Sequence, residues 1–463
     1  LGGEPLSRLI VVSNRVPLPR PDQPQAGGLA VVLSDALSRR GGLWFGWSGQ
    51  LTDHPASRPD HLHHAGIDYA TLPLTRADYD DFYLGYANAV IWPVFHFNLG
   101  AMDYQRRYSH GYARVNARFA DLLAPLVAPD DTIWIHDYHL MPLARELRER
   151  GLRNRIGFFL HIPFPDYDVL RAMPGHRALL EDLCRFDLLG FQTANDRHAF
   201  EESATRAIGA LVRSSGRLRH RNRDLHTGVY PVGVAVDELA DLSARTLTTP
   251  AVQRLLDGLG ERDLMIGVDR LDYSKGLEQR FRAFESLLDE YPYRRGHTVL
   301  MQIASPSRGD IAEYAELRQR LEGLSGHING TYGDLDWAPI HYLNRTFERG
   351  AVMGLYRAAG VGVVTPLRDG MNLVAKEFVA SQDPDNPGVL VLSDLAGAAA
   401  ELTDAIQVNP YDTDAIAAGL NQALAMPRPE RRRRYQRMMT VLRERDIDAW
   451  EQRFLDDLGG ERG

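Results

Sequence analysis

The chain has 463 residues, with 53 Lys and Arg against 61 Asp and Glu, and a formal net charge of −8. Its apolar share of 44% and charged share of 25% are ordinary for a globular protein and exclude a disordered chain. The mild acidity argues against a nucleic-acid-binding protein, and no apolar run approaches the ~20 residues of a membrane span.

Short apolar runs, each followed by polar residues and a helical pattern, recur in the first half of the chain. They predict strands at residues 9–12, 132–135, 156–160 and 187–191. Fully apolar runs are typical of strands buried on both faces, and strands that alternate with helices indicate a parallel sheet. Residues 51–75 and 200–228 carry no usable motif.

The same pattern restarts after residue 233, with predicted strands at residues 264–268, 298–303, 360–364 and 389–392. At about 150 residues per domain the length suits two or three domains. We therefore predict an α/β fold of two doubly wound domains, residues 1–235 and 236–440. Residues 430–458 are expected to be helical, with residues 431–434 on a solvated face, and residues 441–463 to pack back on the first domain.

The N-terminal region offers a candidate phosphate-binding turn and two candidate sugar-packing rings. Gly27 and Gly28 precede a helical pattern, where backbone N–H groups can bind a phosphate, although a plain tight turn fits equally well. The dinucleotide fingerprint G-x-G-x-x-G is absent. Trp44 and Trp47 lie in residues 41–49, which their glycines predict to be a loop. There an indole could pack on a sugar face, the alternative being core packing.

Polar residues follow the strands predicted at 132–135 and 156–160. Since the carboxyl ends of parallel strands meet at the ligand-binding edge of a sheet, Asp137 is a candidate acceptor for sugar hydroxyls. The spacing of His136, Asp137 and His139 matches no zinc pattern, so we predict no metal. His161, at the next strand end, is equally a structural histidine or a ligand contact.

Basic residues follow two strands of the second domain. Arg270 and Lys275 come after residues 264–268, and Arg308 comes after residues 298–303. Arginine can bind two phosphate oxygens at once, and lysine supplies a compact charge. Salt bridges to neighbouring aspartates are the alternative for the first two, and a plain surface arginine for the third.

A glycine-containing turn, residues 365–372, opens a helix in the same domain. Its backbone amides could hold a diphosphate. Glu377, about two turns beyond Gly370, could accept hydrogen bonds from two ribose hydroxyls. A helix cap with a solvent-facing glutamate is the alternative for this segment.

These segments, in this order, resemble the trehalose-6-phosphate synthases, retaining glycosyltransferases with two Rossmann-like domains whose parallel sheets face a central cleft (GT-B). The resemblance spans roughly residues 9–395 and rests on VVSNRVP, AGGLAV, GGLWFGWSG, NAVIWPVFHF, IWIHDYHLMPLA, IGFFLHIPFP, DLLGFQT, DRLDYSKGL, SRGD, INGTYG, VTPLRDGMNLVAKEF and DPDNPGVLVLS.

The resemblance implies glucose transfer from UDP-glucose to glucose 6-phosphate, giving α,α-trehalose 6-phosphate and UDP, without a metal or other cofactor. It implies an acceptor set of Arg15, Trp47, Tyr83, Trp92, Asp137 and Arg308. The implied donor set is Gly27, Gly28, His161, Arg270, Lys275, Asp369, Gly370, Met371, Asn372, Leu373, Val374 and Glu377. Within the two sets together, the expected catalytic residues are Asp137, His161, Arg270, Lys275 and Asp369.

Several alternatives stay open at the level of sequence. The acceptor could be another phosphorylated polyol, as in glucosylglycerol-phosphate synthase or a validamycin-type pseudo-glycosyltransferase, and the donor could be GDP-glucose. A non-catalytic regulatory protein is opposed by intact Arg270, Lys275 and Glu377, and an oxidoreductase by the missing glycine fingerprint. We expect a cytoplasmic protein, because the single cysteine suits a reducing compartment and no signal peptide is visible. A stress-protective role is a family-level expectation, no nucleic acid or membrane partner is expected, and a homo-oligomer is left open.

Overall fold

The computed structural model describes residues 8–19, 33–34, 37–38, 41–214, 216–307 and 312–460. It divides into two compact units, Leu1–Pro231 with Trp450–Gly463, and Val232–Ala449. The sequence placed the first boundary after residue 235 and a terminal segment from residue 441. Among the described helices, none combines the length and the apolar character that a membrane crossing needs.

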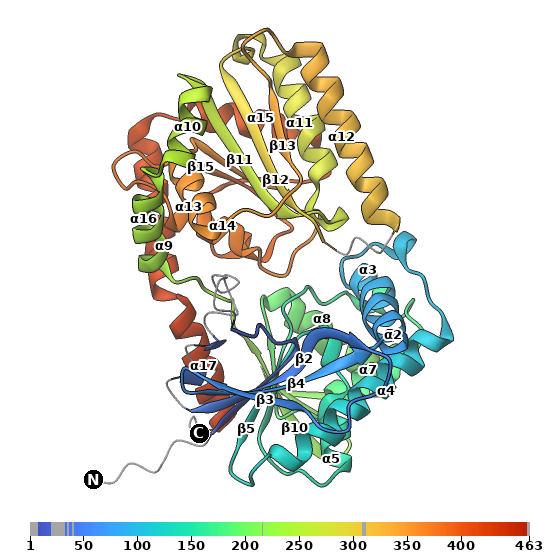
Figure 1. Cartoon of the computed structure of the whole chain (residues 1–463). Helices are drawn as coiled ribbons and strands as arrows, with labels where there is room; N and C mark the ends of the chain where they lie inside the picture. Colours follow the sequence, from blue (N-terminus) through green and yellow to red (C-terminus); the bar gives the residue numbers. More distant parts are fainter. Residues whose placement is uncertain are drawn as a thin grey trace, which may run out of the picture. The chain divides into compact units, whose positions relative to one another are not determined.

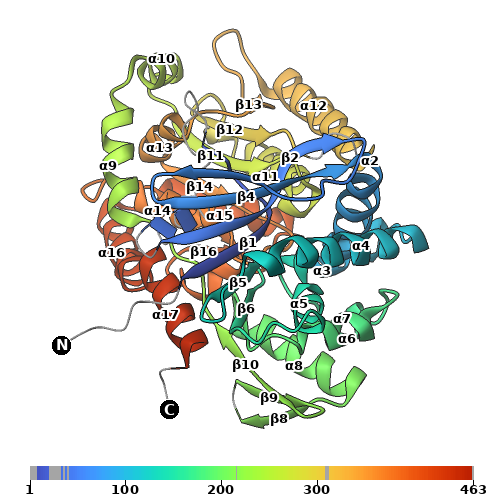
Figure 2. The same cartoon turned by 60° about the horizontal axis from the view of Figure 1, so that its bottom comes forward.

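One sheet forms the centre of the first unit (Figures 1 and 2), with the described strands in the order β3-β4-β2-β1-β5-β6-β7-β10-β9-β8. Pairing is parallel from β4 to β10 and antiparallel only towards the two ends. The predicted strands correspond to β1, β5, β6 and β7. The bounds are β1 (Leu9–Arg15), β2 (Gly42–Thr52), β3 (Asp60–His64), β4 (Ile67–Thr75), β5 (Thr132–His136), β6 (Ile156–Phe159), β7 (Leu188–Phe191), β8 (Leu211–Ser214), β9 (Arg217–His220) and β10 (Arg223–Val229).

The prediction of a loop at residues 41–49 is wrong, because these residues form most of β2 between β1 and β4. The glycines there serve close packing: a Cβ on Gly46 would lie 2.0 Å from the Ser13 carbonyl oxygen. Trp44 is 2% exposed, and its indole Nε1 donates to Ser13 Oγ at 2.9 Å. Trp44 is therefore a core residue and not a ring for a sugar face.

Helices cover this sheet and connect its strands. One of them, α17, comes from the far end of the chain, and its Phe454 ring lies 4.7 Å from that of Trp134. Gly157 and Gly190 make room for it, since a Cβ at either position would lie under 3 Å from the Phe454 ring. The bounds are α2 (Arg76–Asp78), η1 (Tyr79–Ile91), α3 (Trp92–Phe95), η2 (Leu99–Ala101), α4 (Arg106–Leu123), η3 (Ala124–Leu126), η4 (Tyr138–Leu140), α5 (Leu143–Glu149), α6 (Tyr167–Leu170), α7 (His176–Leu183), α8 (Ala194–Ile208) and α17 (Ile447–Gly459).

The second unit has a parallel sheet of described strands in the order β13-β12-β11-β14-β15-β16. Its central strands β14 and β15 are buried throughout and β12 is buried except at its last residue, as expected for a sheet covered on both faces. Four of them, β11, β12, β14 and β15, were predicted. The bounds are β11 (Asp263–Arg270), β12 (Thr298–Ser305), β13 (Ile340–Leu343), β14 (Val361–Val364), β15 (Val389–Ser393) and β16 (Ile406–Val408).

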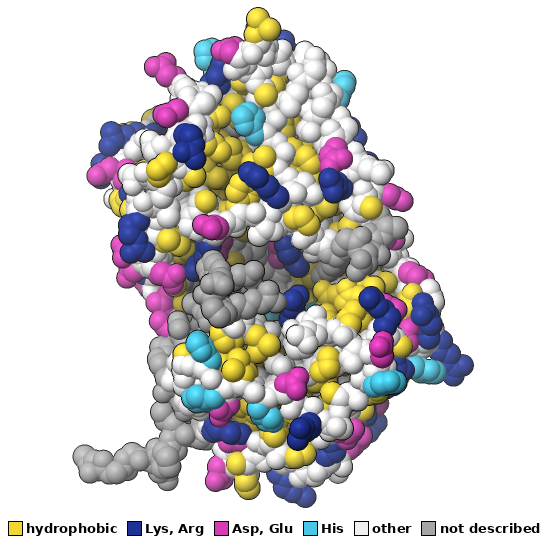
Figure 3. Space-filling model, viewed as in Figure 1, with side chains coloured by type: hydrophobic (Ala, Val, Ile, Leu, Met, Phe, Trp, Pro, Cys, Tyr) yellow, Lys and Arg dark blue, Asp and Glu magenta, His cyan; other side chains and the backbone are white. Residues whose placement is uncertain are grey.

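Helices flank the second sheet on both sides, with α11 and α12 on one side and α13 and α14 on the other (Figure 1). The predicted helical region 430–458 is two helices, α16 and α17, which are separated at Arg445 and Asp446. On the face seen in Figure 3, described basic and acidic side chains are interspersed on both units. The remaining bounds are α9 (Val236–Leu247), α10 (Pro250–Leu259), η5 (Tyr273–Lys275), α11 (Leu277–Glu290), η6 (Pro292–Arg294), α12 (Ala312–Tyr332), α13 (Arg349–Ala358), α14 (Leu373–Ala380), η7 (Gly397–Ala400), α15 (Thr413–Ala425) and α16 (Arg428–Glu444).

Candidate functional site

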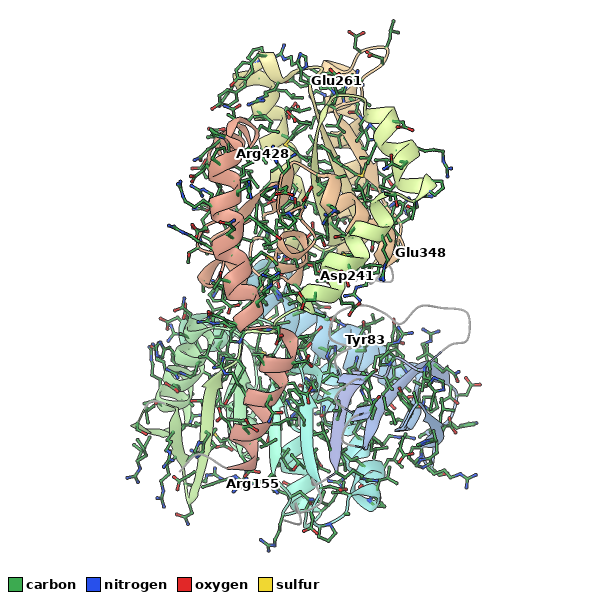
Figure 4. All side chains as sticks on the ribbon, turned by 90° about the vertical axis from the view of Figure 1, so that its left-hand side faces the viewer. Tyr83, Arg155, Asp241, Glu261, Glu348 and Arg428 are labelled. Atoms are coloured by element: carbon green, nitrogen blue, oxygen red, sulfur yellow. The ribbon has the colours of Figure 1, made fainter. Side chains whose placement is uncertain are left out.

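The candidate residues of the first unit gather at the carboxyl ends of its parallel strands. Figure 4 shows Tyr83 and Arg155 at opposite ends of this unit. Arg155 directly precedes β6, so it marks the amino ends of the strands, and Tyr83 lies at the other end. In doubly wound sheets the carboxyl end is the end that binds ligands.

An arginine lying against a row of aromatic rings forms the outer part of this cluster. The guanidinium of Arg15, the last residue of β1, is 5.8 Å from the Trp47 ring, and the Trp47 and Tyr83 rings are 5.7 Å apart. Gly49 (φ 86°) makes this possible, because a Cβ there would lie 2.8 Å from two guanidinium nitrogens. The resulting cation on an aromatic floor suits a phosphorylated sugar.

The helical segment η1 positions Tyr83 and leads into Trp92. It is wound as a π-helix, a conformation often found at functional sites. Asn88 closes the turn by donating to the Tyr83 carbonyl at 2.7 Å, and it accepts from the Tyr138 hydroxyl at 2.9 Å. The Tyr138 ring in turn lies 5.7 Å from that of Trp92. Trp47 and Trp92 are 5% and 3% exposed, so both rings are almost completely buried.

Asp137 and His161 follow the neighbouring strands β5 and β6 and contact each other. The backbone N–H of His161 donates to Asp137 Oδ1 at 3.3 Å. Asp137 has φ 75° and ψ 166°, a conformation that is strained for any residue but glycine. Such strain persists where the surroundings fix it and is concentrated at functional sites. Burial lowers the pKa of His161 to about 3, so its ring is neutral near pH 7.

The second unit holds a separate, charged cluster at the carboxyl ends of β11 and β14. Lys275 Nζ lies 2.5 Å from Asp369 Oδ2, and Asn372 Nδ2 donates to the same oxygen at 3.0 Å. Arg270 ends β11 with an exposed side chain. The Asp369 carboxylate therefore fixes the lysine beside the turn that opens α14.

That turn is held by close backbone contacts. A Cβ on Gly276 would lie 2.3 Å from the Thr365 carbonyl oxygen, and one on Gly397 would lie 1.9 Å from that of Gly370. Met371 is 3% exposed and packs into the hydrophobic core of the second unit. Asn372 (φ 71°) caps α14, and Leu373 and Val374 begin the helix. Their N–H groups belong to the helix start, where an anion is favoured.

Glu377 lies in the middle of α14, and the pKa of its carboxyl is shifted. Burial raises the pKa of its carboxyl to about 7, with Arg349 acting in the opposite direction. The Glu377 side chain is half-buried, so the solvent-facing alternative fits it less well than a shielded position. When ionised, this carboxyl offers two acceptor oxygens to hydroxyl donors, and when protonated it keeps one acceptor oxygen and becomes a donor itself.

Comparison with known proteins decides the family. The model of glycosyltransferase family 20 matches residues 7–459. The chain belongs to glycosyltransferase family 20. A curated trehalose-6-phosphate synthase of Klebsiella pneumoniae is 50% identical over 453 residues, covering 98% of this chain and 95% of that protein. The predicted class of enzyme, a trehalose-6-phosphate synthase of this family, is confirmed.

Two solved structures of family members are similar over the whole chain. An α,α-trehalose-phosphate synthase (UDP-forming) of Burkholderia xenovorans, in complex with glucose-6-phosphate, has a TM-score of 0.94 and 48% identity and covers 98% of this chain and 100% of that one. A structure from E. coli, bound with UDP-2-fluoro glucose, has a TM-score of 0.94 and 48% identity and covers 98% and 99% of the two chains. The predicted fold class, GT-B with Rossmann-like domains, is confirmed.

One buried residue that the sequence analysis did not single out is Arg280 on α11. It is fully buried, its Nη1 lies 2.5 Å from Asp269 Oδ2, and it donates to Gln302 Oε1 at 2.7 Å. Its Nε donates to Thr365 Oγ1 at 3.1 Å, so it ties together the ends of β11, β12 and β14. The signal was present: an arginine in register with Leu277 and Phe284 on the apolar face of a helix needs a buried partner.

Three predicted site residues, Gly27, Gly28 and Arg308, lie outside the described residues. Within the described ranges, no cluster of three or more His, Cys, Asp or Glu side chains is arranged to hold a metal ion. Of the remaining predicted residues, the first unit holds Arg15, Trp47, Tyr83, Trp92, Asp137 and His161, and the second holds Arg270, Lys275, Asp369, Gly370, Met371, Asn372, Leu373, Val374 and Glu377. Direct contacts join Arg15 and Tyr83 to Trp47, His161 to Asp137, and Lys275 and Asn372 to Asp369.

Proposed function

We propose that this protein transfers glucose from UDP-glucose to glucose 6-phosphate with retention of configuration, giving α,α-trehalose 6-phosphate and UDP. The observation that carries the proposal is its full-length similarity to family members solved with each substrate class, glucose-6-phosphate and a UDP-glucose analogue. The first unit supplies most of the acceptor-binding residues, and the second supplies most of the residues that bind the nucleotide sugar. A cytoplasmic location is supported by the single cysteine.

The acceptor assignment rests on the cation and rings of the first cluster. Arg15, with its guanidinium beside Trp47 and Tyr83, binds the 6-phosphate, and Arg308 adds a second charge. Asp137 accepts hydrogen bonds from acceptor hydroxyls, and Trp47 and Trp92 limit the space around the sugar. Two anchors on one small molecule fix its orientation, which is how positioning accelerates a bimolecular reaction.

The donor assignment rests on the charged cluster. Arg270 and Lys275 bind the diphosphate together with the turn amides of residues 370–374, Asp369 and His161 contact the glucose, and Glu377 holds the ribose. As the glycosidic bond to UDP breaks, negative charge grows on the leaving phosphate, and fixed cations aimed at that charge lower the barrier. The leaving phosphate oxygen takes the proton of the incoming hydroxyl on the same face, so retention needs no carboxylate nucleophile of the glycosidase type.

A release assay tests this function directly. Nucleoside diphosphate release is measured in EDTA with UDP-glucose or GDP-glucose, with and without glucose 6-phosphate. We expect release that depends on the acceptor, proceeds with UDP-glucose and does not need Mg²⁺. Release only after addition of Mg²⁺ would overturn the role of Arg270 and Lys275 as sufficient cations. No release with either donor would overturn the acceptor, and glycerol 3-phosphate would then be tried.

A further inference from the structure

Two imidazole rings meet at the ends of the neighbouring strands β5 and β6. His136 is the last residue of β5, and His161 lies two residues beyond β6. His136 Nδ1 is 3.1 Å from His161 Nε2, and the ring planes are 26° apart. Nε2 of His161 is thereby engaged, which leaves Nδ1 as the ring nitrogen for a ligand. No described residue forms a hydrogen bond with that Nδ1.

Both rings are neutral at physiological pH. Burial lowers the pKa of His161 to about 3, and burial and the neighbouring His161 lower that of His136 well below its usual value. A pair of neutral imidazoles shares one hydrogen between the two facing nitrogens. That hydrogen sits either on His136 Nδ1 or on His161 Nε2, and the choice decides whether His161 Nδ1 donates or accepts.

The surroundings of His136 favour one choice. Its other nitrogen, Nε2, is buried with no hydrogen-bond partner among the described residues. The indole rings of Trp134 and Trp450 pack near it, at 4.5 and 6.5 Å between ring centres, and their N–H groups are also buried without acceptors there. A hydrogen on His136 Nε2 would add a third orphaned donor, and buried orphaned N–H groups are rarer than underused acceptors.

We propose that His136 is a positioning residue that fixes His161 in the tautomer with hydrogen on Nδ1. His136 Nδ1–H donates to His161 Nε2, and His161 Nδ1–H is thereby presented as a hydrogen-bond donor to a hydroxyl oxygen of the bound nucleotide sugar. The ligand part of this inference rests on the function proposed above. The tautomer itself is a property of the free protein.

Nitrogen NMR of the free protein tests the tautomer without any activity. Long-range ¹H–¹⁵N spectra of histidine-labelled protein at pH 7 distinguish protonated from bare ring nitrogens, and the loss of one spin system in His161→Gln assigns His161. We expect a protonated Nδ1 and a bare Nε2. A protonated Nε2, or an equal mixture of the two forms, would overturn the proposal even if the enzyme is active.

Two substitutions of His136 separate positioning from packing. His136→Asn keeps an N–H donor near the position of Nδ1, and His136→Leu removes it. We expect the leucine variant to lower kcat/KM for UDP-glucose about tenfold, as for the loss of one hydrogen bond. Its KM for glucose 6-phosphate stays unchanged, and the asparagine variant recovers most of the loss.

Trp134→Phe is the matched packing control, since Trp134 contacts His136 but does not contact His161 through a hydrogen bond. It is expected to leave the His161 tautomer unchanged. Equal losses in the asparagine and leucine variants, with the His161 spectrum unaltered in both, would make His136 merely structural. Absence of acceptor-dependent UDP release in the unmodified protein would instead count against the proposed function, and the NMR result would stand by itself.

Discussion

The two candidate clusters both hold polar groups at the carboxyl ends of strands, but different interactions fix these groups in the two units. In the first unit, one cation lies against aromatic rings, two neutral histidines contact each other, and an aspartate is held in a strained backbone conformation. In the second unit, opposite charges are paired directly, Lys275 with Asp369 and Arg280 with Asp269. Aromatic packing fixes the first cluster, and ion pairs fix the second.

This difference fits the charges that the proposed ligands bring. A sugar phosphate needs one cationic anchor and apolar surfaces for its ring, which aromatic residues supply at little entropic cost. A leaving diphosphate needs cations whose positions do not change as its charge grows. Buried pairing achieves that, although it makes each charge costly to leave alone. Four residues test this contrast, and they are taken in order of decreasing effect.

Replacing Arg280 is expected to have the largest effect. Arg280→Met leaves Asp269 as a buried charge without its partner, which costs about 3–5 kcal/mol of unfolding free energy. Urea unfolding followed by a probe in the second unit measures the loss. Arg282→Ala on the same helix is the control, because its pair with Glu278 is half exposed and contributes under about 1 kcal/mol. Equal losses in the two variants would contradict the network.

Removing Lys275 tests the catalytic use of the charged cluster. Lys275→Ala is expected to lower kcat about 10²-fold or more, the scale for losing one group that stabilises the developing charge. Single-turnover UDP release measures it. Arg320→Ala controls for net charge, since Arg320 is half exposed and pairs with Glu278. A variant with unaltered turnover would refute the role given to Lys275.

Gly49 tests whether packing alone positions the cation of the first cluster. Gly49→Ala would push the Arg15 guanidinium aside, so we expect the KM for glucose 6-phosphate to rise about tenfold with little change in kcat. Gly151→Ala is a matched control, because Gly151 has φ 89° against 86° for Gly49, but nothing lies within 4 Å of its Cβ. Both variants carry the same backbone strain, so a shared KM change would contradict the contact.

The sequence predicted the parallel strands and the strand-end residues because both leave local signals. A buried strand is an uninterrupted apolar run, as in β15, and polar residues directly after it mark the functional edge. It missed β2 because glycines that admit neighbouring strands look like glycines of a loop. His136 and His161 are 25 positions apart in the chain, and Arg280 and Thr365 are 85 positions apart. No local sequence pattern encodes contacts over such separations.

Glu377 tests the second cluster through pH, because burial raises the pKa of its carboxyl to about 7. Because only the ionised carboxylate can accept hydrogen bonds from two ribose hydroxyls with both oxygens, it should bind the ribose better as the pH rises through that value. We expect the affinity for UDP-glucose, measured by calorimetry without acceptor, to improve about fivefold from pH 6 to pH 8, within the tenfold limit for a single such group. Glu377→Gln should bind more weakly at pH 8 and lose this dependence.

Ionisation of Glu377 is expected to lower the stability of the free protein as the pH rises, whereas it raises the affinity for UDP-glucose. Because the folded-state pKa is raised, the neutral carboxyl stabilises the free protein below its ordinary pKa, and that contribution is lost as the pH rises towards 7. Arg349 and Tyr356 are the neighbouring groups coupled to it, and Arg349 moderates the shift. UDP-glucose should therefore stabilise the protein against heat more at pH 8 than at pH 6. A ligand-induced rise in Tm that is equal at both values would show that Glu377 does not meet the ribose as a carboxylate.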